Sequence, residues 1–267
     1  MDFKDYMLKP GEKPLDRIVD DGGFTGIFRK IACVGDSLSS GEMQVLNEDG
    51  TNGYHDMFEY SWGQYIARMC GSTVYNFSRG GMTASEYMNG WAQDNGCWDP
   101  EKKAQAYIIA LGVNDVSRVL AHVYEFGSVY DVTEKPENNP KTVCGYYGAL
   151  LYRYMEMQPE AKFFLMTMPV QPGMAKDRAE LYDRHREFIY ALAKRFKNVY
   201  VLDFRTYAPV YDEDCRRCFW LNGHLNPAGY LLTAKMTASY IDYIIRSEPE
   251  AFGEVALIGT GIRNYKK

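Results

Sequence analysis

Short apolar runs alternate along the chain with longer segments in which apolar residues recur at helical spacing. The runs predict strands at about Phe28–Val34, Thr73–Phe77, Ala106–Leu111, Lys162–Thr167 and Val199–Phe204. The periodic segments predict helices at about Tyr60–Cys70, Ala84–Trp91, Val143–Met157, Lys176–Phe196 and Pro227–Ile245. Five strands separated by helices favour parallel pairing with right-handed crossovers. The expected fold is therefore α/β, a three-layer α/β/α sandwich with a five-stranded parallel sheet of the flavodoxin-like type.

The remaining segments are polar or rich in Gly and Pro. Residues 1–26 are irregular and predict an N-terminal arm, which leaves 27–267 as one domain. Asn47–Met57 is rich in Gly, Asn and Asp and predicts a loop, whereas Val116–Asn139 predicts an insertion or a lid. Neither an internal repeat nor a low-complexity linker interrupts the pattern, so a second domain is not expected.

Composition narrows the class of protein. The 267 residues are 46% hydrophobic and carry a formal net charge of −5, which gives no basic footprint for nucleic acid. No apolar run approaches the roughly 18 residues that a membrane-spanning helix needs. The first residues lack the apolar core of a signal peptide, so a cytoplasmic location is expected.

The six cysteines are scattered, and a chain of this length does not need a disulfide framework. Cys215 and Cys218 have the C-x-x-C spacing of a redox pair or of half a zinc site. No further ligands and no strand-to-helix turn accompany them, so the pattern favours two ordinary thiols in a loop. We expect neither a metal nor a cofactor.

The most informative candidate for chemistry follows the first predicted strand. Gly35-Asp36-Ser37-Leu38 would present the Ser37 hydroxyl at the carboxyl edge of the sheet, where ligands bind in open α/β folds. An exposed hydroxyl on a rigid platform suits a nucleophile. The alternative is an ordinary turn in which Asp36 and Ser37 cap the next helix.

Three further segments supply groups that complement a serine nucleophile. Val74–Thr83 reads as a strand followed by the pair Gly80-Gly81, and Tyr107–Asp115 ends in Gly-x-Asn-Asp. Gly223–Tyr230 carries His224 into the last predicted helix. A hydroxyl, a glycine N–H, a carboxamide and an imidazole are the parts of an acyl-transfer site.

With these four blocks in this order, the chain resembles the SGNH hydrolases, also called GDSL esterases and lipases. The resemblance spans roughly residues 28 to 245. It implies the same three-layer fold, with Ser37 as nucleophile, the Gly81 N–H and the Asn114 amide as oxyanion donors, and His224 as base. Asp36 and Asp115, beside these positions, are expected to bind nearby turn N–H groups.

One position departs from the family. An Asp usually stands three residues before the histidine, but here that residue is Leu221. We expect His224 Nδ1 to donate instead to a backbone carbonyl near Trp220 or Leu221, or to a displaced carboxylate, with the Asn222 amide as a weaker alternative. The nearest acids in the sequence are Asp203, Asp212, Glu213 and Asp214.

The expected function is a serine esterase that removes short acyl groups, acetyl foremost, from a small polar ester such as an acylated carbohydrate. The loops around the site are polar or Gly-rich and offer no long apolar stripe, and His55 in one of them is a candidate lining residue. Two alternatives use the same site, an acyltransferase and a lipase or lysophospholipase. A third is a catalytically silent binding protein on the same scaffold, which the leucine at 221 keeps open.

Overall fold

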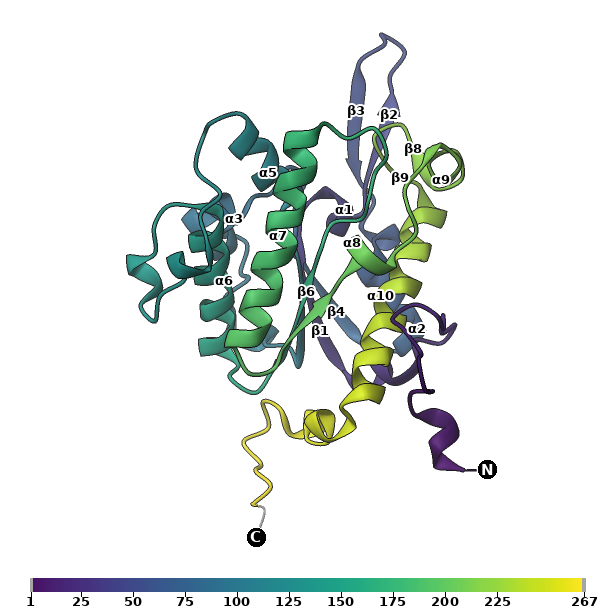
Figure 1. The fold of residues 1–267 in the computed structure, drawn as a ribbon, viewed down its shortest axis with the longest axis vertical. Helices are drawn as coiled ribbons and strands as arrows, with labels where there is room; N and C mark the ends of the chain where they lie inside the picture. The colour runs from purple at the N-terminus through teal and green to yellow at the C-terminus, as the bar shows by residue number, and fades with distance from the viewer. Residues whose placement is uncertain (1, 266–267) are drawn as a thin grey trace.

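The computed structural model describes residues 2–265 and is built around one parallel sheet (Figure 1). The sheet has the order β4-β1-β5-β6-β7, and every neighbouring pair is parallel. Its strands are β1 (Lys30–Gly35), β4 (Thr73–Ser78), β5 (Ala106–Ala110), β6 (Lys162–Met166) and β7 (Val199–Leu202). All five predicted strands are present, and the three-layer α/β/α prediction is confirmed.

Alternate residues of each strand feed two separate cores, because successive side chains in a strand point to opposite faces. Val34 and Ile109 belong to the core beneath α6 and α7, whereas Cys33 and Ile108 belong to the core beneath α2 and α10. Figure 1 shows these helices covering the two faces. The longer helices are α2 (Trp62–Cys70), α5 (Val113–Leu120), α6 (Val143–Met157), α7 (Lys176–Arg195), α9 (Glu213–Phe219) and α10 (Pro227–Ser247).

Two predicted segments have a different structure. The helix expected at 84–91 is broken into α3 (Ala84–Glu86), a π-turn (Tyr87–Trp91) and α4 (Ala92–Asp94), because Gly90 has a φ of 126°. The segment predicted as a loop at 47–57 contains β3 (Asn52–Asp56), which pairs antiparallel with β2 (Glu42–Leu46). We call residues 42–56 the β2–β3 hairpin; it projects beyond the end of the sheet (Figure 1).

A second small hairpin lies beside the first. It pairs β8 (Trp220–Leu221) with β9 (His224–Leu225) across the two-residue loop Asn222-Gly223. Asn222 has a φ of 55°, a left-handed conformation that Asn tolerates better than most residues. The short helices in this region are α1 (Ser37–Ser40) and α8 (Phe204–Tyr207).

The N-terminal arm is bound along α10. The Val19 N–H donates to Ser239 Oγ at 2.9 Å, and Thr25 Oγ1 donates to the Ala238 carbonyl at 2.8 Å. Arg246, buried on α10, forms an ion pair with Glu12 at 2.6 Å. Residues 12–25 therefore form part of the layer that covers α10. No helix within residues 2–265 combines the length and the apolar character needed to cross a bilayer.

Candidate active site

The predicted nucleophile occupies the first position of a one-turn helix at the carboxyl end of β1. Asp36 caps this helix, α1, because its Oδ1 accepts the Leu38 N–H at 3.0 Å. Only glycine fits at 35, where a Cβ would lie 2.1 Å from Ser39 Oγ. Burial raises the pKa of Asp36 to about 7. The Ser37 side chain is half-buried, and its hydroxyl has no hydrogen-bond partner among residues 2–265.

The two predicted oxyanion donors follow the strands on either side of β1. Gly81 lies in the turn after β4 with a φ of 72°, and Asn114 lies in the first turn of α5, directly after β5. Asn114 Nδ2 donates to the Met82 carbonyl at 3.2 Å, and Asp115 Oδ1 accepts the Ala84 N–H at 3.0 Å. The turns after β4 and β5 are thereby joined, and both Asp36 and Asp115 bind turn N–H groups as predicted.

His224 lies in β9, and side chains of the β2–β3 hairpin contact its imidazole ring. Its Nε2 is 3.2 Å from Glu42 Oε1, and its Nδ1 is 3.4 Å from Gln44 Oε1. The Tyr54 ring meets the imidazole edge-on at 5.9 Å between centroids. Burial lowers the pKa of His224 and, with the nearby Asp56 carboxylate, raises that of Glu42. Both shifts favour the uncharged forms of these two groups.

Buried contacts connect the histidine to the serine. The Tyr230 hydroxyl, on α10, donates to the Ser37 carbonyl at 3.4 Å and also to the Glu42 carbonyl. The Glu42 carboxylate lies against Gly80, where a Cβ would come within 2.1 Å of Oε2. The structure thus places all four predicted residues at one end of the sheet, on α1, the turn after β4, α5 and β9. Ser37 and His224 are not hydrogen-bonded to each other within the described chain.

The acids proposed to orient His224 are engaged elsewhere. Burial alone would raise the pKa of Asp203, but hydrogen bonds from Thr206, Arg186 and Tyr190 hold it below its usual value. Asp212 caps α9 through the Cys215 N–H, and Asp214 pairs with Arg217. Neither these acids nor Glu213 contacts the imidazole within residues 2–265, and neither do the carbonyls of Trp220 and Leu221.

Asn222, the weaker alternative, binds the Gln44 carbonyl at 3.0 Å rather than the ring. The prediction of a backbone carbonyl or a carboxylate at Nδ1 is therefore wrong: the Gln44 carboxamide oxygen faces Nδ1, and the nearby carboxylate of Glu42 faces Nε2.

Sequence reasoning misses Glu42 and Gln44 because no strand is predicted for the segment that carries them. A signal is present all the same. Residues 42–45 alternate polar and apolar side chains, and Asp49-Gly50 is a common hairpin turn. His55, the candidate lining residue, is exposed on this hairpin, and its cross-strand partner is Met43.

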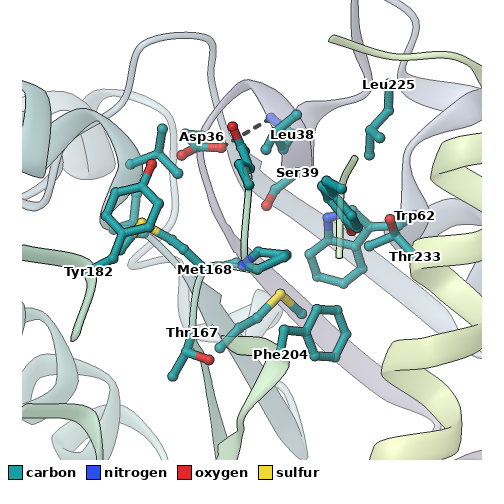
Figure 2. A pocket seen from close by; sticks show the side chains of 17 residues that line it. Asp36, Leu38, Ser39, Trp62, Thr167, Met168, Tyr182, Phe204, Leu225 and Thr233 are labelled. Carbon is teal, nitrogen blue, oxygen red and sulfur yellow. Dashed lines mark hydrogen bonds between the residues drawn. The ribbon is translucent and has the colours of Figure 1, made fainter. Parts of the chain in front are cut away.

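An apolar cavity of about 70 Å³ lies behind the nucleophile turn (Figure 2). Leu38 from α1, Leu225 from β9 and Met168 after β6 line it, and Asp36 contributes a carboxylate. None of the four predicted site residues is in its lining, although three of them are chain neighbours of residues that are. The cavity is adjacent to the polar site and distinct from it.

Cys215 and Cys218 lie on α9, not in a loop as predicted, and both thiols are free. In the described part of the chain, no cluster of three or more His, Cys, Asp or Glu side chains has the arrangement of a metal site.

Comparisons with known proteins identify the family and the fold. The sequence model of the GDSL-like lipase/acylhydrolase family matches residues 33–232, which include all four predicted site residues. No curated protein matches the chain.

Several solved structures share the fold at low sequence identity. A family two carbohydrate esterase from Clostridium thermocellum, in complex with cellohexaose, is 15% identical with a TM-score of 0.56, over 90% of this chain and 66% of that one. A carbohydrate esterase family 2 enzyme from Corynascus thermopiles is 17% identical with a TM-score of 0.55, over 80% and 65%. The acetyl xylan esterase AlAXEase is 14% identical with a TM-score of 0.50, over 79% and 99%.

Proposed function

The chain belongs to the GDSL-like lipase/acylhydrolase family, and on that premise we propose that it is a serine esterase acting through Ser37. The proposed substrates are short acyl esters, acetyl foremost, of a polar alcohol such as a carbohydrate. The observation that supports the proposal is that three predicted site residues follow adjacent strands at the end of the sheet where His224 also lies. Ser37, Gly81 and Asn114 follow the adjacent strands β1, β4 and β5 at one edge of the sheet.

The proposed mechanism is a two-step acyl transfer. Ser37 attacks the ester carbonyl while His224 takes its proton, and the tetrahedral oxyanion is held by the N–H groups of Ser37 and Gly81 and by the Asn114 amide. His224 then protonates the leaving alcohol, and water hydrolyses the acyl-enzyme by the same steps. The mechanism requires His224 Nε2 to exchange its contact with Glu42 for one with Ser37, whose hydroxyl has no other partner in the described chain and is free to donate.

The polarity of the surroundings supports a polar alcohol. Glu42, Gln44 and the exposed Tyr54 all lie beside His224, and an exposed aromatic ring next to hydrogen-bonding groups suits a sugar. All three structural neighbours described above are carbohydrate or acetyl xylan esterases.

The apolar cavity behind Leu38 favours a second candidate, an acylhydrolase for longer acyl chains. Each methylene buried there would contribute about 0.8 kcal/mol to binding. The two candidates are separated by kcat/KM for acetyl and octanoyl esters of one alcohol. We expect acetyl to be preferred. A preference for octanoyl of about tenfold, equivalent to roughly 1.4 kcal/mol of transition-state stabilisation, would reverse the assignment.

The nucleophile is tested by Ser37→Ala, with Ser39→Ala as the matched control on the same helical turn. Ser39 Oγ has no hydrogen-bond partner in the described chain, so its removal breaks no hydrogen bond. We expect Ser37→Ala to lower kcat by at least about 10⁴-fold and to abolish labelling by a fluorophosphonate probe. Ester hydrolysis that survives in Ser37→Ala would refute the proposal. An intact wild-type protein that neither labels nor turns over esters would indicate the silent binding protein.

A further inference from the structure

Both ring nitrogens of His224 are held by the β2–β3 hairpin, Nδ1 by Gln44 and Nε2 by Glu42. We infer that Gln44 is a positioning residue that keeps the Nδ1 proton in place of the acid absent at 221, while Glu42 shares one proton with Nε2 and masks the base until that proton is lost. This inference rests on the proposed role of His224 as the general base.

The position of Gln44 is defined by the loop of the neighbouring hairpin. A Cβ at residue 223 would lie 2.1 Å from Gln44 Oε1, so glycine there is what lets the carboxamide approach the ring. Asn222 Nδ2 donates to the Gln44 carbonyl at 3.0 Å and ties the two hairpins together. Both residues of the two-residue loop thus contact Gln44, and the loop connects directly to His224.

The chemistry of the carboxamide selects one tautomer of the imidazole. Oε1 is only an acceptor, so a hydrogen bond to Nδ1 requires the ring proton to be on Nδ1. Nε2 then carries the lone pair, as a base that must deprotonate a serine requires. A neutral amide stabilises the imidazolium less than a carboxylate does, so His224 is expected to be a weaker base than in a site with the usual Asp.

The contact between Glu42 and His224 determines how many protons the two side chains hold together. With Nδ1 protonated, the 3.2 Å contact between Nε2 and Oε1 needs one more proton between them. A protonated Glu42 facing a neutral ring and an ionised Glu42 facing an imidazolium contain the same number of protons, so the pair titrates as a unit. When the shared proton leaves for solvent, two lone pairs face each other and the contact becomes repulsive. The Glu42 side chain is 14% exposed and can then turn towards water, which leaves Nε2 for Ser37.

The charges around Glu42 favour a retained proton. Burial raises the pKa of Glu42, and Asp56, its cross-strand partner on β3, raises it further. The Glu42 carboxyl in turn raises the pKa of Asp36 in the nucleophile turn. Tyr230 contacts Glu42 from α10 through a neutral hydroxyl, and Gly80 brings no charge. No cation other than His224 itself is paired with Glu42 in the described residues. These surroundings therefore favour a proton held between Glu42 and His224 over an ionised Glu42 beside a neutral ring.

The first test follows protonation without any substrate. Two-dimensional NMR of ¹⁵N-histidine-labelled protein reports the tautomer and titration of each of the four imidazoles, with His224→Asn used for assignment. We expect neutral His224 to be the Nδ1–H tautomer. Glu42→Gln and Glu42→Ala should lower its titration midpoint by about one pH unit, because an adjacent carboxylate stabilises the imidazolium. Glu48→Gln, the same change at an exposed position of the same hairpin, should leave it unmoved. A neutral Nε2–H tautomer, or a midpoint unaffected by both Glu42 variants, would overturn the inference.

The second test concerns Gln44. Gln44→Leu should shift His224 towards a mixture of tautomers and lower kcat by about 10- to 100-fold, below the loss of about 10⁴ known for a wrong tautomer, with KM within about threefold. Gln44→Glu restores an acceptor and should recover the Nδ1–H tautomer even if the leucine variant folds poorly. Loss of kcat with an unchanged tautomer would count against the positioning role.

The third measurement is the pH profile of kcat/KM. Loss of the shared proton makes the wild-type rate rise with pH, and removal of the Glu42 carboxylate should move this acidic limb to lower pH. A plateau more than about tenfold lower in Glu42→Gln would instead make Glu42 an activating group and contradict the mask. If NMR gives the expected tautomer and midpoint shifts but no ester is hydrolysed, the esterase proposal fails. The inferred positions of the protons on His224 and Glu42 would still be supported.

Discussion

The serine side and the histidine side of the site are built in different ways. Ser37, Gly81 and Asn114 each follow a strand of one parallel sheet, so the backbone hydrogen bonds of that sheet fix their relative positions. His224 instead belongs to a two-residue strand, and side chains of a second small hairpin hold its ring. The electrophile-binding half is therefore a property of the main fold, whereas the base depends on a few side-chain contacts between two hairpins.

This difference predicts where substitutions act on chemistry alone and where they also disturb geometry. The largest effect is expected on the serine side. Asn114→Ala removes a side-chain oxyanion donor, and such losses lower kcat by about 100- to 1000-fold. The sheet keeps the other donors in place, so KM should change little.

Asn114 also donates to the Met82 carbonyl, so the control must separate catalysis from loop packing. Thermal unfolding of Asn114→Ala and of Ser117→Ala, the loss of another polar side chain on α5, provides this comparison. A drop in kcat/KM that came entirely from KM would mean that Asn114 binds substrate without stabilising the transition state.

A smaller effect is expected where the two sides meet. Tyr230→Phe removes the buried hydroxyl that contacts the carbonyls of both Ser37 and Glu42. An unpaired buried acceptor costs about 1–3 kcal/mol, and the base of the β2–β3 hairpin should loosen relative to α1. We expect a lower unfolding midpoint and a loss in kcat of about 3- to 10-fold.

Tyr240→Phe is the control, because Tyr240 is another buried tyrosine on α10. Its ring packs against Phe204 and Tyr207 and not against the site. Equal activity losses in both variants would indicate a general effect of destabilising α10.

The same contrast explains what the sequence can predict. Apolar runs that end in Gly-Asp-Ser, Gly-Gly or Gly-x-Asn mark buried parallel strands and their carboxyl ends, so local signals are enough to predict the sheet and the serine side. Gly112 illustrates this, since it has a φ of 142° and a Cβ at this position would lie 2.8 Å from His185 Nε2. Only glycine suits that turn.

The partners of His224 have no such local signal. Glu42 and Gln44 are about 180 residues away from it in the sequence, and two-stranded hairpins are stabilised mainly by the contacts that they make in the folded protein. The alternation covers only residues 42–45, so it does not stand out as a strand. Helix α5 is also missed, because its eight residues, Val113–Leu120, are too few for a clear helical repeat, and its second half lies in the segment predicted as an insertion.

The smallest effect is expected from the substitution that makes this chain look most like its family. Leu221→Asp restores the acid three residues before the histidine. Leu221 is paired with His224 across the β8–β9 hairpin, so its side chain lies on the same face as the imidazole and is 40% exposed. Gln44 Oε1 is already the partner of Nδ1, and a solvent-exposed carboxylate interacts only weakly with the ring. We therefore expect kcat to change by less than about threefold.

Leu221→Asn, which has the same shape as the aspartate without its charge, is the control. In the double variant with Gln44→Leu, however, the new carboxylate has no competitor for Nδ1 and should restore part of the lost kcat. An increase of about tenfold or more in the single variant would show that the imidazole lacks an effective partner, and that the hairpin does not replace the missing acid.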